Sequence, residues 1–196
     1  MKIAVLASGR GSNAAALFKA KESGILRDAE FACLISDKPD APALEEAKLH
    51  GVESVYIPPE HQGAKISETA CLKYIEFLKS RNVELVVLAG FMRILPPAFV
   101  EAFQGNMINL HPSLLPSFKG KDAIKQAFEY GVKICGCTVH FVSNELDAGK
   151  IIAQKAVEIL PSDTLQAIES KVHEAEHNLL ISVVSDFCSG KFQKNA

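Results

Sequence analysis

Short apolar runs recur along this chain and are separated by longer stretches in which apolar residues return every three or four positions. Five runs cover residues 3–7, 31–35, 55–57, 85–89 and 107–110, and a sixth strand is expected over residues 138–142. The first five are almost continuously apolar, which is typical of strands whose two faces are both covered by helices. The pattern therefore predicts buried strands in one sheet.

Amphipathic stretches between these runs predict helices. Residues 66–78 carry apolar side chains four positions apart on one stripe. A second helix is expected to begin with Asp122 as its N-cap and to stop at Gly131. A long last helix is expected to start near Ser162 or Asp163 and to keep its apolar stripe as far as Val183.

Strands that alternate with helices indicate an α/β fold. We expect a Rossmann-like, mostly parallel β-sheet with helices on both faces, forming a single domain over residues 1–196. In such a sheet the ligand crevice lies beyond the carboxyl ends of the strands, so functional residues should directly follow the apolar runs.

Composition narrows the class of protein. The chain is 48% hydrophobic, and 21 basic residues against 23 acidic ones give a net charge of −2, which argues against a nucleic-acid partner. Five cysteines make a poor disulfide framework and predict reduced thiols in the cytoplasm. No stretch is long enough for a signal peptide or a membrane span, so we expect no membrane partner.

A glycine-rich loop follows the first strand. Gly11, Ser12 and Asn13 precede an alanine-rich helix, and free amides at a helix N-terminus suit a phosphate. Two alternatives stay open. Residues 9–14 also match a dinucleotide fingerprint in which Asp37 would hold a ribose. The plainest interpretation is a tight turn with Ser12 or Asn13 as an ordinary N-cap.

Two polar side chains end the fifth run. Asn109 and His111 stand two apart in an expected strand, so both can face one pocket. An amide donor beside a proton-transferring imidazole suits acyl transfer. Asp147, in a loop after the sixth strand, is the candidate that would orient His111 and favour its charged form.

Other signals are weaker. Residues 173–177 match the zinc-protease pattern H-E-x-x-H, but only 19 residues follow and they contain no histidine, so we expect no metal site. Cys135 and Cys137 are expected to pack within a strand. His140 alternates with apolar neighbours and is as compatible with a structural role as with a supporting one.

Several strings together resemble the phosphoribosylglycinamide formyltransferases, which are folate-dependent enzymes of purine synthesis. They are Gly-Ser-Asn at 11–13, Leu-Ala-Gly-Phe-Met-Arg-Ile-Leu at 88–95, Asn-Leu-His-Pro-Ser-Leu-Leu-Pro at 109–116, Val-His-Phe-Val at 139–142 and Glu-Leu-Asp-Ala-Gly at 145–149. The match is colinear over nearly the whole chain. It implies transfer of a formyl group from 10-formyltetrahydrofolate, as co-substrate, to the amine of glycinamide ribonucleotide.

The resemblance also implies roles for individual residues. Asn109 and His111 would stabilise the tetrahedral oxyanion, His111 would also handle protons, and Asp147 would favour the charged imidazole and position a relaying water. Residues expected at the ribonucleotide are Gly11, Ser12, Asn13 and Glu176. Residues expected at the folate are Met92, Arg93, Ile94, Leu95 and Asn109, largely through backbone groups.

The chain departs from the family pattern at two points. Lys119-Gly120 stands where the family often has Pro-Gly, which predicts a less rigid loop. The family's folate-binding basic residue near Ser67 has Lys65 as its nearest candidate, which we leave unassigned.

Alternative functions remain at this stage. A formyltetrahydrofolate deformylase or a methionyl-tRNA formyltransferase would share the catalytic residues but would resemble this fold plus an additional domain. An NAD(P)-binding oxidoreductase and a non-catalytic nucleotide sensor are further alternatives. We expect small-molecule substrates and a monomer or homodimer.

Overall fold

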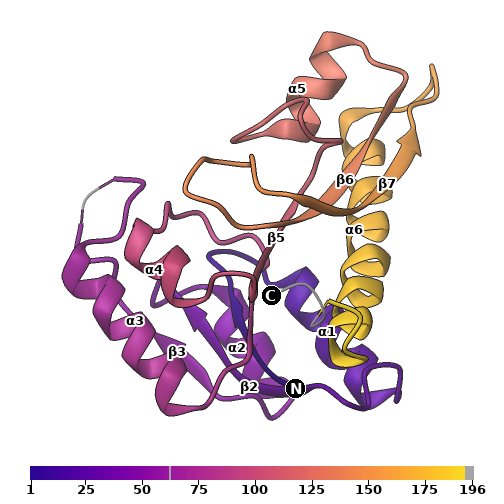
Figure 1. Ribbon diagram of the computed structural model, residues 1–196. Coiled ribbons are helices and arrows are strands. Elements are labelled where there is room, and N and C mark those ends of the chain that lie inside the picture. Colours follow the sequence, from indigo (N-terminus) through magenta and orange to yellow (C-terminus); the bar gives the residue numbers. More distant parts are fainter. Residues whose placement is uncertain (62, 193–196) are drawn as a thin grey trace.

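The computed structural model describes residues 1–61 and 63–192, so the last four residues of the predicted domain lie outside it. Its centre is a seven-stranded sheet in the order β3-β2-β1-β4-β5-β6-β7 (Figure 1). The strands are β1 Lys2–Leu6, β2 Glu30–Ser36, β3 Ser54–Tyr56, β4 Leu85–Leu88, β5 Met107–His111, β6 Ile134–Phe141 and β7 Ile151–Glu158. β1 to β5 pair in parallel, whereas β6 and β7 are antiparallel. The predicted mostly parallel, Rossmann-like sheet is confirmed.

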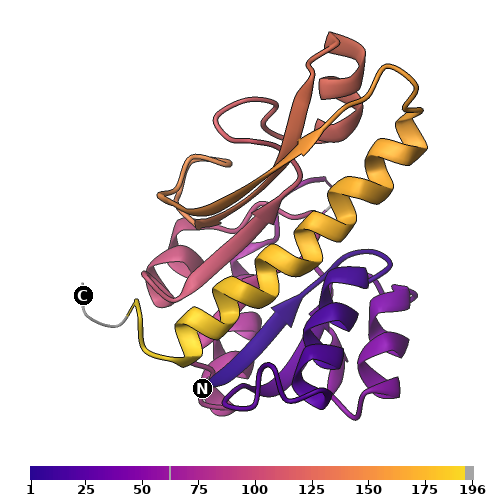
Figure 2. The ribbon, with the colours of Figure 1, turned by 90° about the vertical axis from the view of Figure 1, so that its right-hand side faces the viewer.

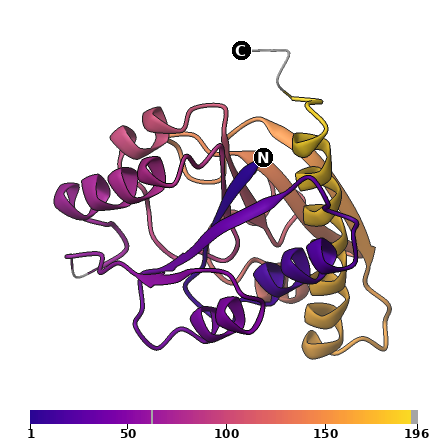
Figure 3. The same cartoon turned by 90° about the horizontal axis from the view of Figure 1, so that it is seen from below.

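Helices cover both faces of the sheet, as predicted. They are α1 Ser12–Glu22, α2 Pro42–Leu49, α3 Glu68–Ser80, α4 Pro97–Ala102, α5 Ala123–Tyr130 and α6 Leu165–Cys188. Seen from below, α3 and α4 lie on one side of β1 and β2, and α1, α2 and α6 on the other (Figure 3). Alternate residues of β1 accordingly enter different cores: Ile3 and Val5 face α1 and α6, whereas Ala4 and Leu6 face α3. This arrangement explains why the strands are apolar without alternation.

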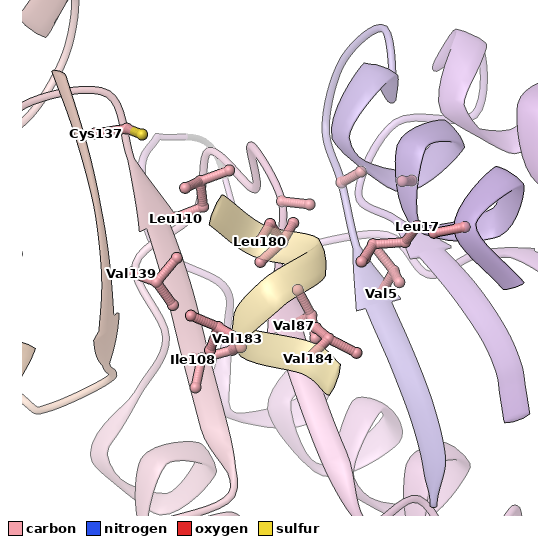
Figure 4. Close-up of a cluster of buried hydrophobic side chains, with 14 of the residues drawn as sticks. Val5, Leu17, Val87, Ile108, Leu110, Cys137, Val139, Leu180, Val183 and Val184 are labelled. Carbon is pink, nitrogen blue, oxygen red and sulfur yellow. The ribbon is translucent and has the colours of Figure 1, made fainter. Parts of the chain in front are cut away.

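The last helix closes one core. α6 crosses the sheet diagonally from the β6–β7 end toward β1 (Figure 2). Its Leu180, Val183 and Val184 lie between α1 and the strands that carry Val87 and Ile108 (Figure 4). All five side chains are at most 2% exposed, and burying each contributes roughly 1.5–3 kcal/mol.

One strand was missed: β7 was not predicted, because this edge strand mixes exposed polar residues with apolar ones and has no buried run. Asp122 occupies the N-cap position of α5 as expected, in a left-handed conformation with φ of 55° and without a side-chain capping hydrogen bond. α6 begins at Leu165, close to the expected start near Ser162 or Asp163, and is capped by the Thr164 hydroxyl, which accepts from the Ala167 amide. Gly131 ends α5 as expected, in a left-handed conformation.

The strand order reverses direction beside β1. From β1 the chain continues outward to β2 and β3, and then returns to the other side of β1 as β4. A crevice for ligands forms at such a switch point, beyond the carboxyl ends of the strands. The glycine loop follows β1, the segment around residue 92 follows β4, and His111 ends β5, so the sheet assembles these three segments along one edge. No helix among residues 1–61 and 63–192 has the length and apolar character required to cross a membrane.

Candidate active site

The end of β5 carries the predicted polar pair on one face of the sheet. Ile108 and Leu110 point into the core under α6, so Asn109 and His111 point to the opposite face. β6 pairs antiparallel with β5 in a register that places His140 directly opposite Asn109. Directly opposed residues project from the same face, so the register brings a second imidazole to the pair.

Asp147 lies at the centre of this cluster, although it is 36 residues from His111 along the chain. Its Oδ2 is 3.5 Å from His111 Nδ1 and accepts a 2.9 Å hydrogen bond from the Gly120 amide. Its Oδ1 accepts from Asn109 Nδ2 at 3.4 Å. The structure therefore brings together the three residues that we predicted to form the catalytic group.

Both ring nitrogens of His111 face acceptors. Nε2 lies 2.9 Å from the carbonyl oxygen of Phe118, to which it must donate, and Nδ1 faces the Asp147 carboxylate. An imidazolium ring has a proton for each acceptor, whereas a neutral ring protonated on Nε2 turns a lone pair toward the carboxylate. His111 and Asp147 are only 5% and 8% exposed, so their interaction is little screened by solvent.

Sequence reasoning missed two backbone groups of this site. The carbonyl of Phe118 and the amide of Gly120 contact His111 and Asp147 from the loop that follows β5. Backbone contacts leave no residue-type signal, so composition and spacing could not have found them. The positive φ of Phe118, 53°, is uncommon for a residue with a side chain and marks the loop as locally strained.

The glycine loop leaves the N-terminus of α1 open. Gly11 has φ of 80°, and an added Cβ would lie 2.8 Å from the Cα of Ala43, so only glycine fits there. The plain N-cap interpretation was wrong, because Gly11 occupies the cap and no side chain caps the helix. No acceptor among the described residues takes the amide protons of Ser12 or Asn13. Next to the loop lies a hollow of about 360 Å³, which Arg10, Ser12 and Lys19 help to line.

The segment after β4 presents apolar side chains and backbone groups. Met92 and Ile94 are 59% and 40% exposed. The Met92 amide donates to Ser8 Oγ, and the Ile94 amide donates to the carbonyl of Ala64. The next residue of that loop, Lys65, forms a parallel bridge with Ile94, so the unassigned cation lies beside the predicted folate segment.

The side chain of Arg93 is held by partners within the protein. Its Nε donates to Asp37 Oδ2 at 2.5 Å, and its guanidinium also donates to the carbonyl of Gly63. Because the side chain of Asp37 is completely buried in this pair, it is not available to a ribose. The dinucleotide interpretation therefore lacks the acidic residue that it requires for binding a ribose.

Glu176 lies apart from the β5 cluster. Its buried carboxylate accepts from His173 Nδ1 at 2.7 Å on α6, and this hydrogen bond raises the pKa of His173. Within H-E-x-x-H, the first histidine is thus paired with Glu176 and not with His177. Across the described part of the chain, no group of three or more His, Cys, Asp and Glu side chains could hold a metal ion.

Comparison with known proteins identifies the family. The profile described as "Formyl transferase" matches residues 1–184. The chain belongs to the formyl transferase family. This formyl transferase is 44% identical over 184 residues to the phosphoribosylglycinamide formyltransferase of Bacillus subtilis, covering 93% of the chain and 92% of the relative. Its structure matches the crystal structure of glycinamide ribonucleotide transformylase 1 from Symbiobacterium toebii with a TM-score of 0.90 and 39% identity, over 97% of this chain and 88% of that one.

A second kind of relative is much longer. The trifunctional purine biosynthetic protein adenosine-3 of Gallus gallus is 39% identical over 193 residues, which are 98% of this chain but 19% of the relative. The chain therefore spans about a fifth of that protein's length. The predicted family and the prediction of a formyl-transferring enzyme are confirmed, and they are favoured over the oxidoreductase and deformylase alternatives.

Proposed function

We propose that this enzyme transfers a formyl group from 10-formyltetrahydrofolate to the amine of glycinamide ribonucleotide in de novo purine synthesis. The observation that carries the proposal is the convergence of Asn109, His111 and Asp147 at the carboxyl end of β5. The relatives that cover most of the chain bear the name of this activity, which supports the choice of substrates. The substrates are small molecules.

Asn109 stabilises the charge that develops on oxygen. When the amine attacks the formyl carbon, the carbonyl electrons move to the oxygen, and a donor fixed in advance lowers the barrier. One N–H of the Asn109 amide faces His140 Nε2 at 3.1 Å, and the other is held only loosely by Asp147 at 3.4 Å. Asn109 is the half-exposed member of a buried cluster, so its second N–H is the one that substrate can reach.

His111 carries the proton. The attacking amine loses a proton, and N10 of the folate must gain one as its bond to carbon breaks. A charged imidazole gives its proton to N10, and the neutral ring that remains takes up the proton that the amine loses, so the ring returns to its starting form. The Asp147 carboxylate lies 3.5 Å from Nδ1 of this ring and orients it. To act, the Nε2–H of His111 exchanges the Phe118 carbonyl for the substrate.

The two substrates bind on either side of this cluster. The uncapped amides at Ser12 and Asn13, with Gly11, receive the ribonucleotide phosphate, because a helix N-terminus favours an anion. Glu176 accepts from the ribose hydroxyls. The exposed apolar side chains of the 92–95 segment pack against the pterin, and Arg93 and Leu95 contribute backbone groups, since the Arg93 side chain is occupied by Asp37. No step of this mechanism needs a metal ion.

The decisive experiment follows folate product by absorbance with and without glycinamide ribonucleotide. We expect product only when the acceptor is present. Equal rates without the acceptor would indicate a hydrolase and would reject the proposal. Equilibrium dialysis with NAD and NADP serves as the control for the dinucleotide alternative, and we expect no binding of either.

A further inference from the structure

His140 is a buried histidine to which the mechanism above gives no step. It is 2% exposed and lies opposite Asn109 on β6. Gly149 packs so closely against this point that an added Cβ would lie 1.7 Å from the Phe141 carbonyl oxygen and 3.3 Å from His140 Nδ1. The ring is therefore held tightly in one place.

The hydrogen bonds of His140 define its tautomer. Nδ1 lies 2.8 Å from the carbonyl oxygen of Phe141, which can only accept, so Nδ1 carries a proton. Nε2 lies 3.1 Å from Asn109 Nδ2, which can only donate, so Nε2 carries a lone pair. The ring is neutral and acts as an acceptor toward Asn109.

Asp147 fixes the orientation of the Asn109 amide independently. The Asn109 atom that faces His140 is also 3.4 Å from Asp147 Oδ1. An amide oxygen at that position would confront a carboxylate oxygen, so the atom is nitrogen. A nitrogen donor there requires an acceptor on His140, which agrees with the tautomer derived from Phe141.

We propose that neutral His140 is a positioning residue that binds one N–H of Asn109 and thereby keeps the amide in place while its other N–H, held at 3.4 Å by Asp147, passes to the formyl oxygen. This inference rests on the proposed function and assigns a role to a residue outside the predicted catalytic three. It explains how a flexible amide keeps its position when substrate arrives, since the hydrogen bond to His140 is retained and only the longer contact to Asp147 is exchanged.

The surrounding charges are compatible with a neutral ring. Burial lowers the pKa of His140, and charges on His111 and Lys119 act in the same direction, whereas the hydrogen bond to the Phe141 carbonyl and the charge on Asp147 oppose them. Asp147 Oδ1 lies 3.8 Å from Nε2, which is longer than the contact from Asn109 to the same nitrogen. The direction of this shift agrees with the lone pair on Nε2 that the hydrogen-bond partners require.

A double-mutant cycle tests the role. We expect His140→Leu to lower kcat between about tenfold and 100-fold with both KM values nearly unchanged, because a misaimed group affects the reaction more than binding. In the Asn109→Ala background, the same substitution should have no further effect. Full activity of His140→Leu, or equal effects in both backgrounds, would overturn the proposal. If wild-type enzyme forms product only with the acceptor, such a failure concerns His140 alone.

The conservative variant and a spectroscopic readout keep the test independent of folding. His140→Gln places an amide oxygen near the position of Nε2 and should recover most of the lost kcat; activity as low as that of His140→Leu would contradict the proposal. In the wild-type protein, ¹⁵N shifts of labelled histidines should give the Nδ1–H tautomer for His140 at neutral pH. An Nε2–H tautomer or an imidazolium would overturn it.

Discussion

The end of β5 and the N-terminus of α1 lie at the same edge of the sheet, but they differ in whether their polar groups have partners within the protein. At β5, His111, Asp147 and His140 are nearly buried, and their polar atoms face partners that the protein itself provides. At α1, Ser12 is exposed, the helix has no side-chain cap, and the amides of Ser12 and Asn13 have no acceptor among the described residues. The first region holds donors and acceptors in advance, whereas the second leaves them for a ligand.

This difference indicates that the end of β5 serves the reaction, whereas the N-terminus of α1 serves binding of the ribonucleotide. Groups that act on the transition state gain from being fixed before the reaction. Groups that bind an anion gain nothing from an internal partner that must first be displaced. Substitutions at β5 should therefore act on kcat, and substitutions at α1 should act on the KM of the ribonucleotide.

The largest effect is expected at His111. His111→Ala removes the proton donor and should lower kcat by about 10³-fold, within the range for general acid–base groups. Steady-state kinetics with both substrates would measure it, and circular dichroism would verify the fold. His50→Ala is the matched control, because His50 is also paired with carboxylates, those of Glu22 and Glu46, but lies on the far end of α2. A wild-type rate in His111→Ala would contradict the catalytic role of the β5 end and its contrast with α1.

A smaller effect is expected at Asp147. Asp147→Asn keeps the shape but removes the negative charge beside His111, and we expect kcat to fall between about tenfold and 100-fold. Steady-state kinetics with both substrates would measure the loss, and circular dichroism would verify the fold. Asp163→Asn is a suitable control, since Asp163 accepts from a backbone amide and pairs with Lys171 away from the site. Full activity of Asp147→Asn would contradict the role of Asp147.

At α1 the expected change is in binding. Gly11→Ala strains a backbone with φ of 80° and forces a Cβ against Ala43, so it should destabilise the fold by about 1–3 kcal/mol. By displacing the loop, it should also raise the KM of the ribonucleotide more than that of the folate. Gly24→Ala isolates the strain, because Gly24 has φ of 81° but nothing within 4 Å of an added Cβ. A larger rise in the folate KM would show that the two pockets have been exchanged.

The sequence predicts much of this architecture, and the reasons for the exceptions are physical. The buried strands were found because both of their faces lack water, and the Asn109–His111 pair was found because strand side chains alternate. Edge strand β7 was missed because its exposed residues follow no such rule. The role of His140 was left open because it depends on the register between β5 and β6, which two separate strands do not reveal until they are paired.

The proximity of Asp147 to His111 was an inference from loop composition, and the structure supplies the distance. The contacts from Phe118 and Gly120 could not have been predicted, because backbone groups are the same in every residue. Glu176 was placed beside the buried stripe of its helix, but its burial and its pairing with His173 needed the packed structure. The sequence thus predicts which side chains are buried better than it predicts which of them contact one another.

The smallest expected effect concerns His173, which links α6 to the ribonucleotide region. The hydrogen bond to Glu176 raises the pKa of His173 in the folded protein, while Arg10 opposes and Glu169 assists this shift. A folded-state pKa above the unfolded value means that the pair's contribution to stability is complete below the unfolded pKa of about 6.5 and is lost as pH rises through the folded value. The melting temperature of wild-type enzyme relative to His173→Gln should therefore decrease from pH 6 toward pH 8. A constant difference in melting temperature would show that His173 does not change charge between pH 6 and pH 8. A difference that increases with pH would contradict the stabilising coupling between charged His173 and Glu176.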